Sequence, residues 1–542
     1  MNARKISSII MTALLVVGAL SGCKKNVEVA VTDNKSTTDI TFPLKEKITL
    51  TEWVPFSSTL IKTLDENKVY QELEKKTNIH IKFIHPAAGQ EAEAFNIMIA
   101  SNDLPDIIQN APSMYAGGPD KAIDDNVYVK LNDYIDKYAP NYKKLRMSDP
   151  EISRQTQTDA KNIYAFNCIQ TAEEPAWDGL TVRKDWLEDL GLQAPKTIDE
   201  WHNVLVQFKE KKGATAPLLF SFGWELEANS AFSSAYNVTP GFYNENGTVK
   251  YGPVQQGYKS FLTTMAAWYK EGLIDKDFAT RDYKGANALF TSGKAGAKFN
   301  GYGDFGGYNS AGKKIDSKFA LLSVANIPVK EGDKLHFRTT NTKNKGGEAV
   351  ITTANKHIPE TVKWFDYAYS DEGFLLFNYG VEKTSWDWKE GAVPDIDKAF
   401  YPEALKSQNK FPQYNDFMLV NPDGSAFWDL ISEYKVHLSA YLRDPMADGG
   451  MDGDVKQAMD EWTKPGNDWV MPPVTHTNTE NQEITSIMSD VNTYINEMNL
   501  RFVMGNEPLS KFDDFTSKVK SMGIDKVTKD KQAALERYNS RK

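Results

Sequence analysis

Residues 48–53 read Ile-Thr-Leu-Thr-Glu-Trp and alternate apolar with polar side chains, which is the period of a strand with one buried face. Residues 79–84, Ile-His-Ile-Lys-Phe-Ile, repeat the alternation, and a spaced apolar pattern between the two favours a helix. A second helical segment at about 90–100 leads to a break and then to Asp106 and the apolar pair Ile107 and Ile108. This order predicts a parallel sheet covered by helices with right-handed crossovers.

Such a sheet also predicts where a site lies. In open α/β sheets, ligands bind beyond the carboxyl ends of the strands. The loops that follow Trp53, His85 and Ile108 are therefore the first candidates for a binding site.

Further along the chain, the pattern of strands and helices repeats. Residues 179–187 predict a strand and a short helix, Gly191 stops that helix, and a new helix follows that Thr197 or Asp199 can cap. Another helix is expected over residues 255–271, and residues 286–301 predict a helix, a turn and a short buried strand.

The N-terminus has the layout of an export signal. Arg4 and Lys5 precede an apolar run over residues 9–20, and small residues lead to Cys23. The ending Leu20-Ser21-Gly22-Cys23 resembles the lipobox of bacterial lipoproteins, in which the cysteine is lipidated and becomes the first residue. The alternatives are a transmembrane anchor, for which the run is too short, and an ordinary cleaved signal, which does not need Cys23. The polar stretch that follows, up to about residue 44, predicts a flexible tether.

Composition limits the classes of function. Removing residues 1–22 from 542 leaves 520, which is more than one core usually holds, so two lobes are expected. Only Cys168 remains besides Cys23, which excludes an intramolecular disulfide and cysteine-based metal sites. A formal net charge of −10 disfavours nucleic acid as a partner. The 12 Trp, 24 Tyr and 27 Phe residues suit the flat apolar faces of sugars.

Five stretches follow one another behind the lipobox: Leu104 to Ile108, Arg183 to Trp186 with Pro195 to Thr197, Gly272 to Asp275, Phe290 to Gly301, and Pro359 to Gly373. In this order they resemble the extracellular solute-binding proteins of ABC importers, in the family-1 branch that includes maltose-binding protein. The resemblance covers most of the mature chain, and the length is similar to that of the large oligosaccharide-binding lipoproteins, such as the alginate-binding members.

The resemblance implies an α/β fold of two lobes (type II), each a mainly parallel sheet flanked by helices, with a hinge between them. The inferred organisation is a signal peptide over 1–22, a tether over 23–44, an N-lobe over 45–178 plus 349–395, and a C-lobe over 179–348 plus 396–542. The chain is then expected to cross between lobes near Trp177, Gly347 and Pro394.

The function that the resemblance implies is capture of an oligosaccharide by lobe closure and its delivery to an ABC permease. Such a protein is not an enzyme, carries no cofactor, is expected to be a monomer, and is held on the outer face of the cell membrane by the lipid on Cys23. The sequence contains neither a G-x-S-x-G nor an H-E-x-x-H motif. An exported glycoside hydrolase remains an alternative, because its two acids would be assembled in space, and a surface glycan adhesin is another.

The candidate ligand-binding residues are mostly aromatic, because a ring beside a polar acceptor suits a sugar. Each of them could instead belong to a core or to ordinary loop packing. From the first half of the chain they are Trp53, Asn110, Trp177 and Trp224, and from the second half Tyr302, Phe305, Trp386, Asp387 and Trp388.

Two further motifs carry weaker predictions. Gly301, Gly303 and Gly306 spell G-x-G-x-x-G, but this stretch opens no obvious βαβ unit and lies in an exported protein, which argues against a dinucleotide site. Four aspartates at positions 444, 448, 452 and 454 form an acidic run that lacks the spacing of a calcium loop. We therefore predict a solvated acidic loop rather than a metal site, with calcium as the one metal ion left open.

Overall fold

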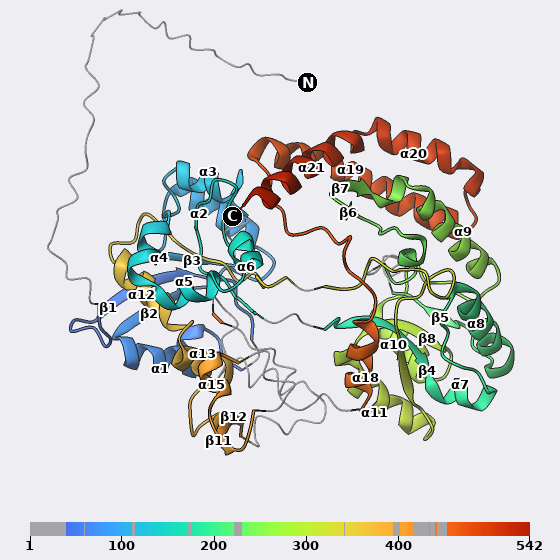
Figure 1. Ribbon diagram of the computed structural model, residues 1–542, viewed down its shortest axis with the longest axis horizontal. Helices are drawn as coiled ribbons and strands as arrows, with labels where there is room; N and C mark the ends of the chain where they lie inside the picture. Colours follow the sequence, from blue (N-terminus) through green and yellow to red (C-terminus); the bar gives the residue numbers. More distant parts are fainter. Residues whose placement is uncertain are drawn as a thin grey trace, which may run out of the picture. The chain divides into compact units, whose positions relative to one another are not determined.

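The computed structural model describes residues 40–58, 60–110, 114–171, 175–221, 230–340, 342–393, 401–415, 433, 440–441 and 453–541 (Figure 1). The export signal, Cys23, most of the predicted tether, Trp224 and the predicted crossing at Pro394 lie outside these residues. Within them, every helix is too short or too polar to cross a membrane.

The first sheet contains the two strands from which the fold was predicted. Strands β1 (Ile48–Trp53) and β2 (Ile79–Ile84) pair in parallel, β3 (Ile107–Gln109) pairs in parallel with β1, and β10 (Ala349–Ile351) pairs antiparallel with β3. The order is β10-β3-β1-β2. The predicted bounds of β1 and β2 are confirmed to the residue.

Each face of the first sheet is buried by a different hydrophobic cluster. Leu50, Ile79 and Ile107 belong to the larger cluster, here called the first core, which also contains Phe166 and Phe365. The opposite face carries a smaller cluster formed by alternate strand residues together with helix α2 (Glu91–Ser101). Burial on both faces fits the central strand β3, in which the consecutive residues Ile107 and Ile108 are both buried.

Helix α1 (Lys68–Thr77) shows how local sequence positions these strands. The Asn67 side chain accepts from the backbone N–H groups of Val69 and Tyr70, which caps the first turn. The helix ends at Asn78, which takes a left-handed φ of 60° and leads directly into β2.

The second sheet has the order β5-β8-β4-β9. Its strands are β4 (Asp178–Arg183), β5 (Leu218–Leu219), β8 (Ala297–Gly301) and β9 (Leu321–Val324). One face packs in the second core, defined by Leu180, Phe208 and Phe299. Residues of four helices complete this core: α9 (Gln256–Lys270), α19 (Asn478–Val503), α20 (Phe512–Ser521) and α21 (Ile524–Ser540). The other face packs on a smaller cluster that includes Phe290, Phe305 and Trp462.

In each sheet three strands run one way and the fourth runs against them. Strand β4 pairs antiparallel with both β8 and β9, so β5, β8 and β9 share one direction, and β10 is the opposing strand of the first sheet. The predicted α/β class is confirmed and the first sheet is mainly parallel, but two of the three pairings in the second sheet are antiparallel, because β4 lies between β8 and β9. The two opposing strands are β4, which begins one residue after Trp177, and β10, which begins two residues after Gly347. Both therefore begin close to a predicted crossing between the lobes.

Helix α18 (Gly453–Trp462) protects the second sheet at its edge. The Gln457 amide accepts from the backbone N–H of Ser323 and donates to its carbonyl, at 2.9 and 2.8 Å, as a neighbouring strand would. Trp462 lies over Gly179, where any Cβ would approach its ring to 2.4 Å, and its Nε1–H donates to the Leu180 carbonyl. The edge of β9 is thereby closed to further pairing.

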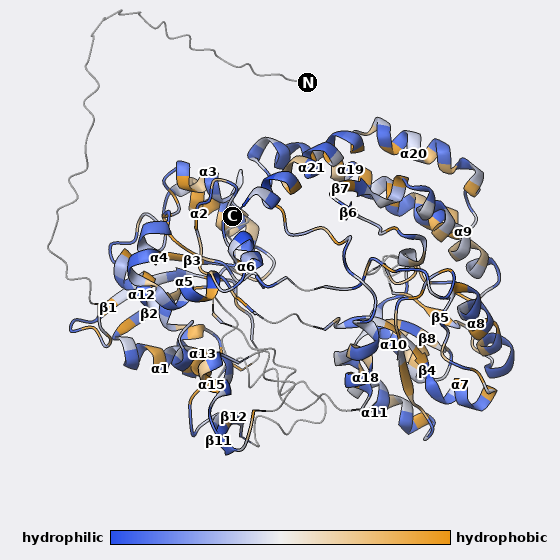
Figure 2. Ribbon diagram, in the orientation of Figure 1, coloured by the Kyte–Doolittle hydropathy of each residue, from blue (hydrophilic) through white to orange (hydrophobic). Residues whose placement is uncertain are grey.

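The remaining elements complete the two cores (Figure 1). Around the first sheet lie α3 (Gly118–Asp124), α4 (Asn132–Tyr138), α5 (Pro140–Arg146), α6 (Pro150–Gln155), α12 (Ile358–Tyr367), α13 (Asp371–Tyr379), α15 (Glu403–Lys406), β11 (Trp386–Glu390) and β12 (Lys410–Tyr414). Around the second lie α7 (Lys184–Leu190), α8 (Ile198–Lys212), α9 (Gln256–Lys270), α10 (Tyr283–Thr291), α11 (Phe305–Ile315), α19 (Asn478–Val503), α20 (Phe512–Ser521), α21 (Ile524–Ser540) and the hairpin of β6 (Phe242–Glu245) and β7 (Thr248–Tyr251). Figure 2 shows hydrophilic and hydrophobic residues on the same helices, as expected for amphipathic helices that cover a core.

One predicted lobe boundary disagrees with the packing. Tyr401, Leu405, Tyr414 and Tyr441 are buried in the first core, whereas the sequence predicted that the chain returns to the C-lobe at residue 396. The apolar side chains of this segment pack against α13, so it belongs with the first sheet. The other predicted bounds stay predictions.

Candidate functional site

The carboxyl end of β8 carries an accessible pair of aromatic residues, Trp177 and Tyr302, both predicted as site residues. Strand β4 begins opposite Gly301, and the pairing continues one step further, where the Tyr302 N–H donates to the Trp177 carbonyl at 3.1 Å. The Trp177 side chain is 44% exposed, and its ring passes within 3.9 Å of the position that a Cβ on Gly301 would occupy. The indole therefore lies beside the end of the strand with much of its surface open to solvent.

Polar groups precede this pair on the same strand. Asn300 is almost fully buried, and its side-chain amide donates to the Gly301 carbonyl at 3.3 Å. Two residues earlier, the buried Lys298 ammonium donates to the Phe299 carbonyl at 2.9 Å and lies 5.6 Å from the ring of the exposed Tyr283. Sequence reasoning missed Asn300 and Lys298. Their position directly before the glycine-rich stretch that begins at Gly301 is the sequence feature that could have indicated them.

In the first sheet, Asn110 follows β3 at its carboxyl end, as predicted. Its side chain is exposed, and its backbone takes a left-handed φ of 59°, which asparagine tolerates. The Asn110 N–H donates to the Glu348 carbonyl at 2.9 Å, next to the start of β10. Burial raises the pKa of the Glu348 carboxyl above its ordinary value. Each sheet therefore has one exposed predicted residue beside the carboxyl end of a parallel strand. It is Asn110 after β3 in the first sheet and Trp177 beside β8 in the second.

Three predicted binding residues prove to be core residues. Trp53 is 4% exposed and packs edge-on against Phe95, because its side chain points to the sheet face that α2 covers. Phe305 is 1% exposed and packs against Trp462. Trp386 is 2% exposed, and its Nε1–H donates to the Gly380 carbonyl at 3.0 Å. A buried ring offers no face to a ligand, so the prediction that these three contact ligand is corrected.

The other predicted residues of this group lie in the β11–β12 hairpin. Trp388 is half-buried, with the Lys410 ammonium 4.4 Å from its ring centroid and the Trp386 ring 5.1 Å away. Asp387 is exposed, and its carboxylate accepts from the Trp388 N–H at 2.7 Å. The hairpin belongs to neither four-stranded sheet, and Lys410 already lies against the Trp388 ring.

The glycine-rich stretch has a context that the sequence did not predict. It ends β8 and leads into α11, and β9 follows in the same direction as β8, so the stretch does open a βαβ unit. In a dinucleotide fingerprint the third glycine permits close packing of helix and strand. Here a Cβ on Gly303 or Gly306 would meet no atom within 4 Å. These glycines do not serve that packing, which argues against a dinucleotide site on geometric grounds.

The acidic run predicted as a solvated loop is described at only one of its aspartates. Three of its four aspartates lie outside the described residues, and Asp454 in α18 accepts from the Asn309 amide at 2.8 Å. Among the side chains that the structure describes, no three His, Cys, Asp or Glu residues are grouped so that they could hold a metal ion. The solvated acidic loop, with calcium left open, therefore stays a prediction.

Comparison with known proteins identifies the chain's relatives. The fructooligosaccharide ABC transporter substrate-binding protein FusA of Streptococcus pneumoniae is 26% identical over 583 aligned positions, covering 99% of this chain and 98% of FusA. Lipoprotein LipO of Bacillus subtilis is 25% identical over 62% of this chain and 67% of LipO. The solved structure of the alginate-binding protein AlgQ2 without calcium ion superposes with a TM-score of 0.66 at 25% identity, covering 92% of this chain and 99% of AlgQ2.

A family model also matches more than half of the chain. The matched residues, 59–373, include strands β2, β3 and β10 of the first sheet, the whole second sheet and the Trp177–Tyr302 pair. The model describes the bacterial extracellular solute-binding proteins. The two-lobed architecture predicted from the sequence is the architecture of this group, and the chain belongs to the bacterial extracellular solute-binding proteins.

Proposed function

We propose that this protein captures an oligosaccharide outside the cell and delivers it to an ABC permease. Family membership supports a binding function, and the match to FusA over nearly all of both chains supports an oligosaccharide as the ligand. The observation that carries the proposal is the exposed Trp177 indole beside Tyr302 at the carboxyl end of β8. An indole of this kind binds the apolar face of a sugar ring, while side-chain amides such as that of Asn110 suit its hydroxyl groups.

In this proposal the two lobes bind the sugar from both sides and close over it. The protein contributes binding energy and positioning, and it does not cleave the sugar. An ATPase elsewhere supplies the energy for import. The permease recognises the closed, ligand-bound form.

A thermal-shift screen of the full chain tests the proposal. A ligand that binds only the native state must raise its apparent stability, by about 2.7 kcal/mol at a hundredfold excess over Kd. The panel contains neutral and acidic oligosaccharides from plants, algae and bacteria, and at least one is expected to raise the unfolding temperature. After long incubation at equimolar concentration, the bound sugar is expected to be recovered intact. Shorter fragments that accumulate with time would instead identify a glycoside hydrolase.

Replacement of Trp177 by alanine is expected to weaken binding of the best sugar in that screen by roughly tenfold. Loss of a stacked ring removes on the order of 1 kcal/mol or more of interaction, and each 1.4 kcal/mol is one decade in Kd. Stability should change less than for a core tryptophan, because 44% of the side chain is exposed. Calorimetric titration and urea unfolding measure the two quantities.

Two variants serve as controls for that titration. Trp177→Phe keeps a flat ring and should recover much of the affinity. Met147→Ala removes another exposed apolar side chain, at the end of α5, and should bind as the wild type does. Native affinity in a folded Trp177→Ala protein would remove the indole from the site.

We further propose that a lipid on Cys23 anchors the protein to the outer face of the cell membrane. The Leu20-Ser21-Gly22-Cys23 ending supports this, as does the similarity to a protein named a lipoprotein. In cells that express Cys23→Ala, the protein is expected in the medium or the soluble fraction instead of with the membranes. If fractionation finds the variant still bound to membranes, the lipid is not the anchor.

A further inference from the structure

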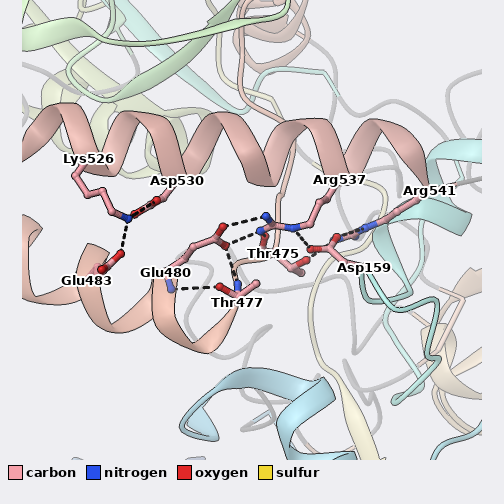
Figure 3. A network of polar contacts seen from close by, with 9 residues as sticks. All are labelled: Asp159, Thr475, Thr477, Glu480, Glu483, Lys526, Asp530, Arg537 and Arg541. Carbon is pink, nitrogen blue, oxygen red and sulfur yellow. Dashed lines mark hydrogen bonds and ion pairs between the residues drawn. The ribbon is translucent and has the colours of Figure 1, made fainter.

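The last turn of α21 forms a polar network with a segment more than 370 residues earlier in the chain (Figure 3). Arg537 lies in the last turn of the helix, and Arg541 is the C-cap residue that follows its end at Ser540. Both contact the Asp159 carboxylate: Arg537 Nε donates to Oδ2 at 2.7 Å, and Arg541 donates to Oδ1 from Nε at 2.9 Å and from Nη2 at 2.6 Å. One carboxylate thus binds two guanidinium groups.

The Arg541 side chain fills a socket rather than lying on a surface. It is 2% exposed. Besides Asp159, its Nη1 donates to the carbonyls of Arg154 and Gln157, at 2.8 and 2.9 Å, and its Nη2 donates to the Thr475 hydroxyl. These contacts use the full donor set of a guanidinium, which presents five N–H groups in a rigid fork. A lysine has no fork and cannot make the same set.

The socket joins elements of different cores. Helix α21 belongs to the second core through Ile524 and Val527. Asp159 lies between Ile152 and Ile163, and both of these belong to the first core. The contacts of Arg541 therefore tie a helix of one core to a loop of the other.

Arg537 extends the network to the start of α19. Its Nη1 and Nη2 donate to the two Glu480 oxygens, at 2.9 and 2.5 Å. Glu480 also completes the capping box of α19, because its carboxylate accepts from the Thr477 N–H at 2.8 Å. Burial opposes ionisation of Glu480, but the hydrogen bonds from Arg537 and Thr477 outweigh it and hold the pKa of this carboxyl below its ordinary value. Positive and negative groups alternate from Arg541 through Asp159 and Arg537 to Glu480.

We propose that this network is an interlobe clamp, in which Asp159, Arg537 and Arg541 fix the pivot about which the lobes close. The three are positioning residues: they act on ligand capture by limiting lobe movement and do not touch the ligand. The link to ligand capture rests on the proposed function, whereas the clamp itself rests on the contacts alone. It can therefore be tested without ligand.

Hydrogen exchange of the full chain without ligand tests the clamp. In Arg541→Gln, amides of residues 151–163 are expected to exchange about tenfold faster or more. In the variant this segment can open without breaking the buried hydrogen bonds of Arg541. Arg541→Lys should show the same pattern, since it keeps the charge and loses the fork. Small-angle scattering of the same variants should give a larger radius of gyration than the wild type.

The matched control is Lys526→Gln. Lys526 lies on the same helix and contacts Glu483 and Asp530, but these partners belong to α19 and α21 themselves (Figure 3). This variant should keep wild-type exchange over 151–163 and a wild-type radius. If Arg541→Gln does not fold, Asp159→Asn, which keeps an acceptor oxygen, should give the same changes in weaker form.

Wild-type exchange and radius in the folded Arg541 or Asp159 variants would overturn the clamp. Faster exchange over residues 151–163 with an unchanged radius of gyration would show that the network does not fix the pivot. Because neither measurement uses a sugar, failure of the thermal-shift screen would leave the clamp standing, and failure of the clamp would leave the binding function standing.

Discussion

Replacement of Trp386 by alanine is expected to lower the free energy of unfolding by about 3–5 kcal/mol, the cost of removing a large aromatic side chain from a core. The ring is 2% exposed and packs against Tyr379, with centroids 5.9 Å apart. Its one polar atom donates to the Gly380 carbonyl. Truncation would leave a cavity in the first core and a buried carbonyl without its donor.

Urea unfolding measures this loss, and sugar binding by the folded fraction is measured beside it. Trp386→Phe should fall between the wild type and the alanine variant, because it keeps a ring and loses the hydrogen bond. Trp388→Ala, in the same hairpin but half-buried, should cost less. If Trp386→Ala is as stable as the wild type and binds sugar at least tenfold more weakly, Trp386 contacts ligand and its burial in the core is not its role.

Glu52 is expected to make the protein less stable as the pH rises from about 5 to about 8. The side chain lies on β1, points to the same face as Leu50, and is fully buried. Burial raises the pKa of Glu52 to about 8, from an ordinary value of 4.5. Between these two values the unfolded chain has released the proton and the folded chain still holds it. Stability then falls by about 1.4 kcal/mol per pH unit, and the fall ends above pH 8.

Glu52→Gln removes this dependence while keeping the shape of the side chain. The difference in unfolding free energy between Glu52→Gln and the wild type should grow in favour of the variant by about 3 kcal/mol between pH 5 and pH 7.5. Urea midpoints at the two pH values give this difference, and they cancel the contributions of other buried acids such as Glu348 and Asp366. A difference that is the same at both pH values would mean that Glu52 is ionised in the folded protein.

The parts of the fold that were predicted from sequence are those set by local rules. Strands β1 and β2 have the predicted bounds because alternation of apolar and polar residues is a local pattern. Helix α8 begins where predicted, since the Thr197 hydroxyl accepts from the Glu200 N–H, and α7 ends at Gly191, which has a left-handed φ of 66°. Each of these signals lies within a few residues of the feature that it predicts.

The direction of a tryptophan side chain does not follow from such rules. Trp53 is the last residue of β1, and Trp177 directly precedes the first residue of β4. The first is buried against α2, whereas the second is exposed beside Gly301. The difference depends on what packs on each face of the sheet, which is a tertiary property. The same reason explains why Trp386 and Phe305 were predicted as binding residues and lie in cores.

Contacts between distant segments were also beyond the sequence. Arg541 and Asp159 are 382 residues apart, and neither has a neighbouring pattern that points to the other. The edge of β9 is closed by Gln457, 134 residues later, through a side chain that imitates a strand. Both contacts depend on the order of strands in the sheets and on the helices that return to them.

Solution scattering of the full chain, with and without the oligosaccharide that gives the largest thermal shift, tests the central claim most directly. If the protein captures sugar by closing two lobes over it, the radius of gyration at saturation must be smaller than that of the free protein. An identical scattering profile at saturating sugar would contradict capture by closure and would favour a rigid glycan-binding protein.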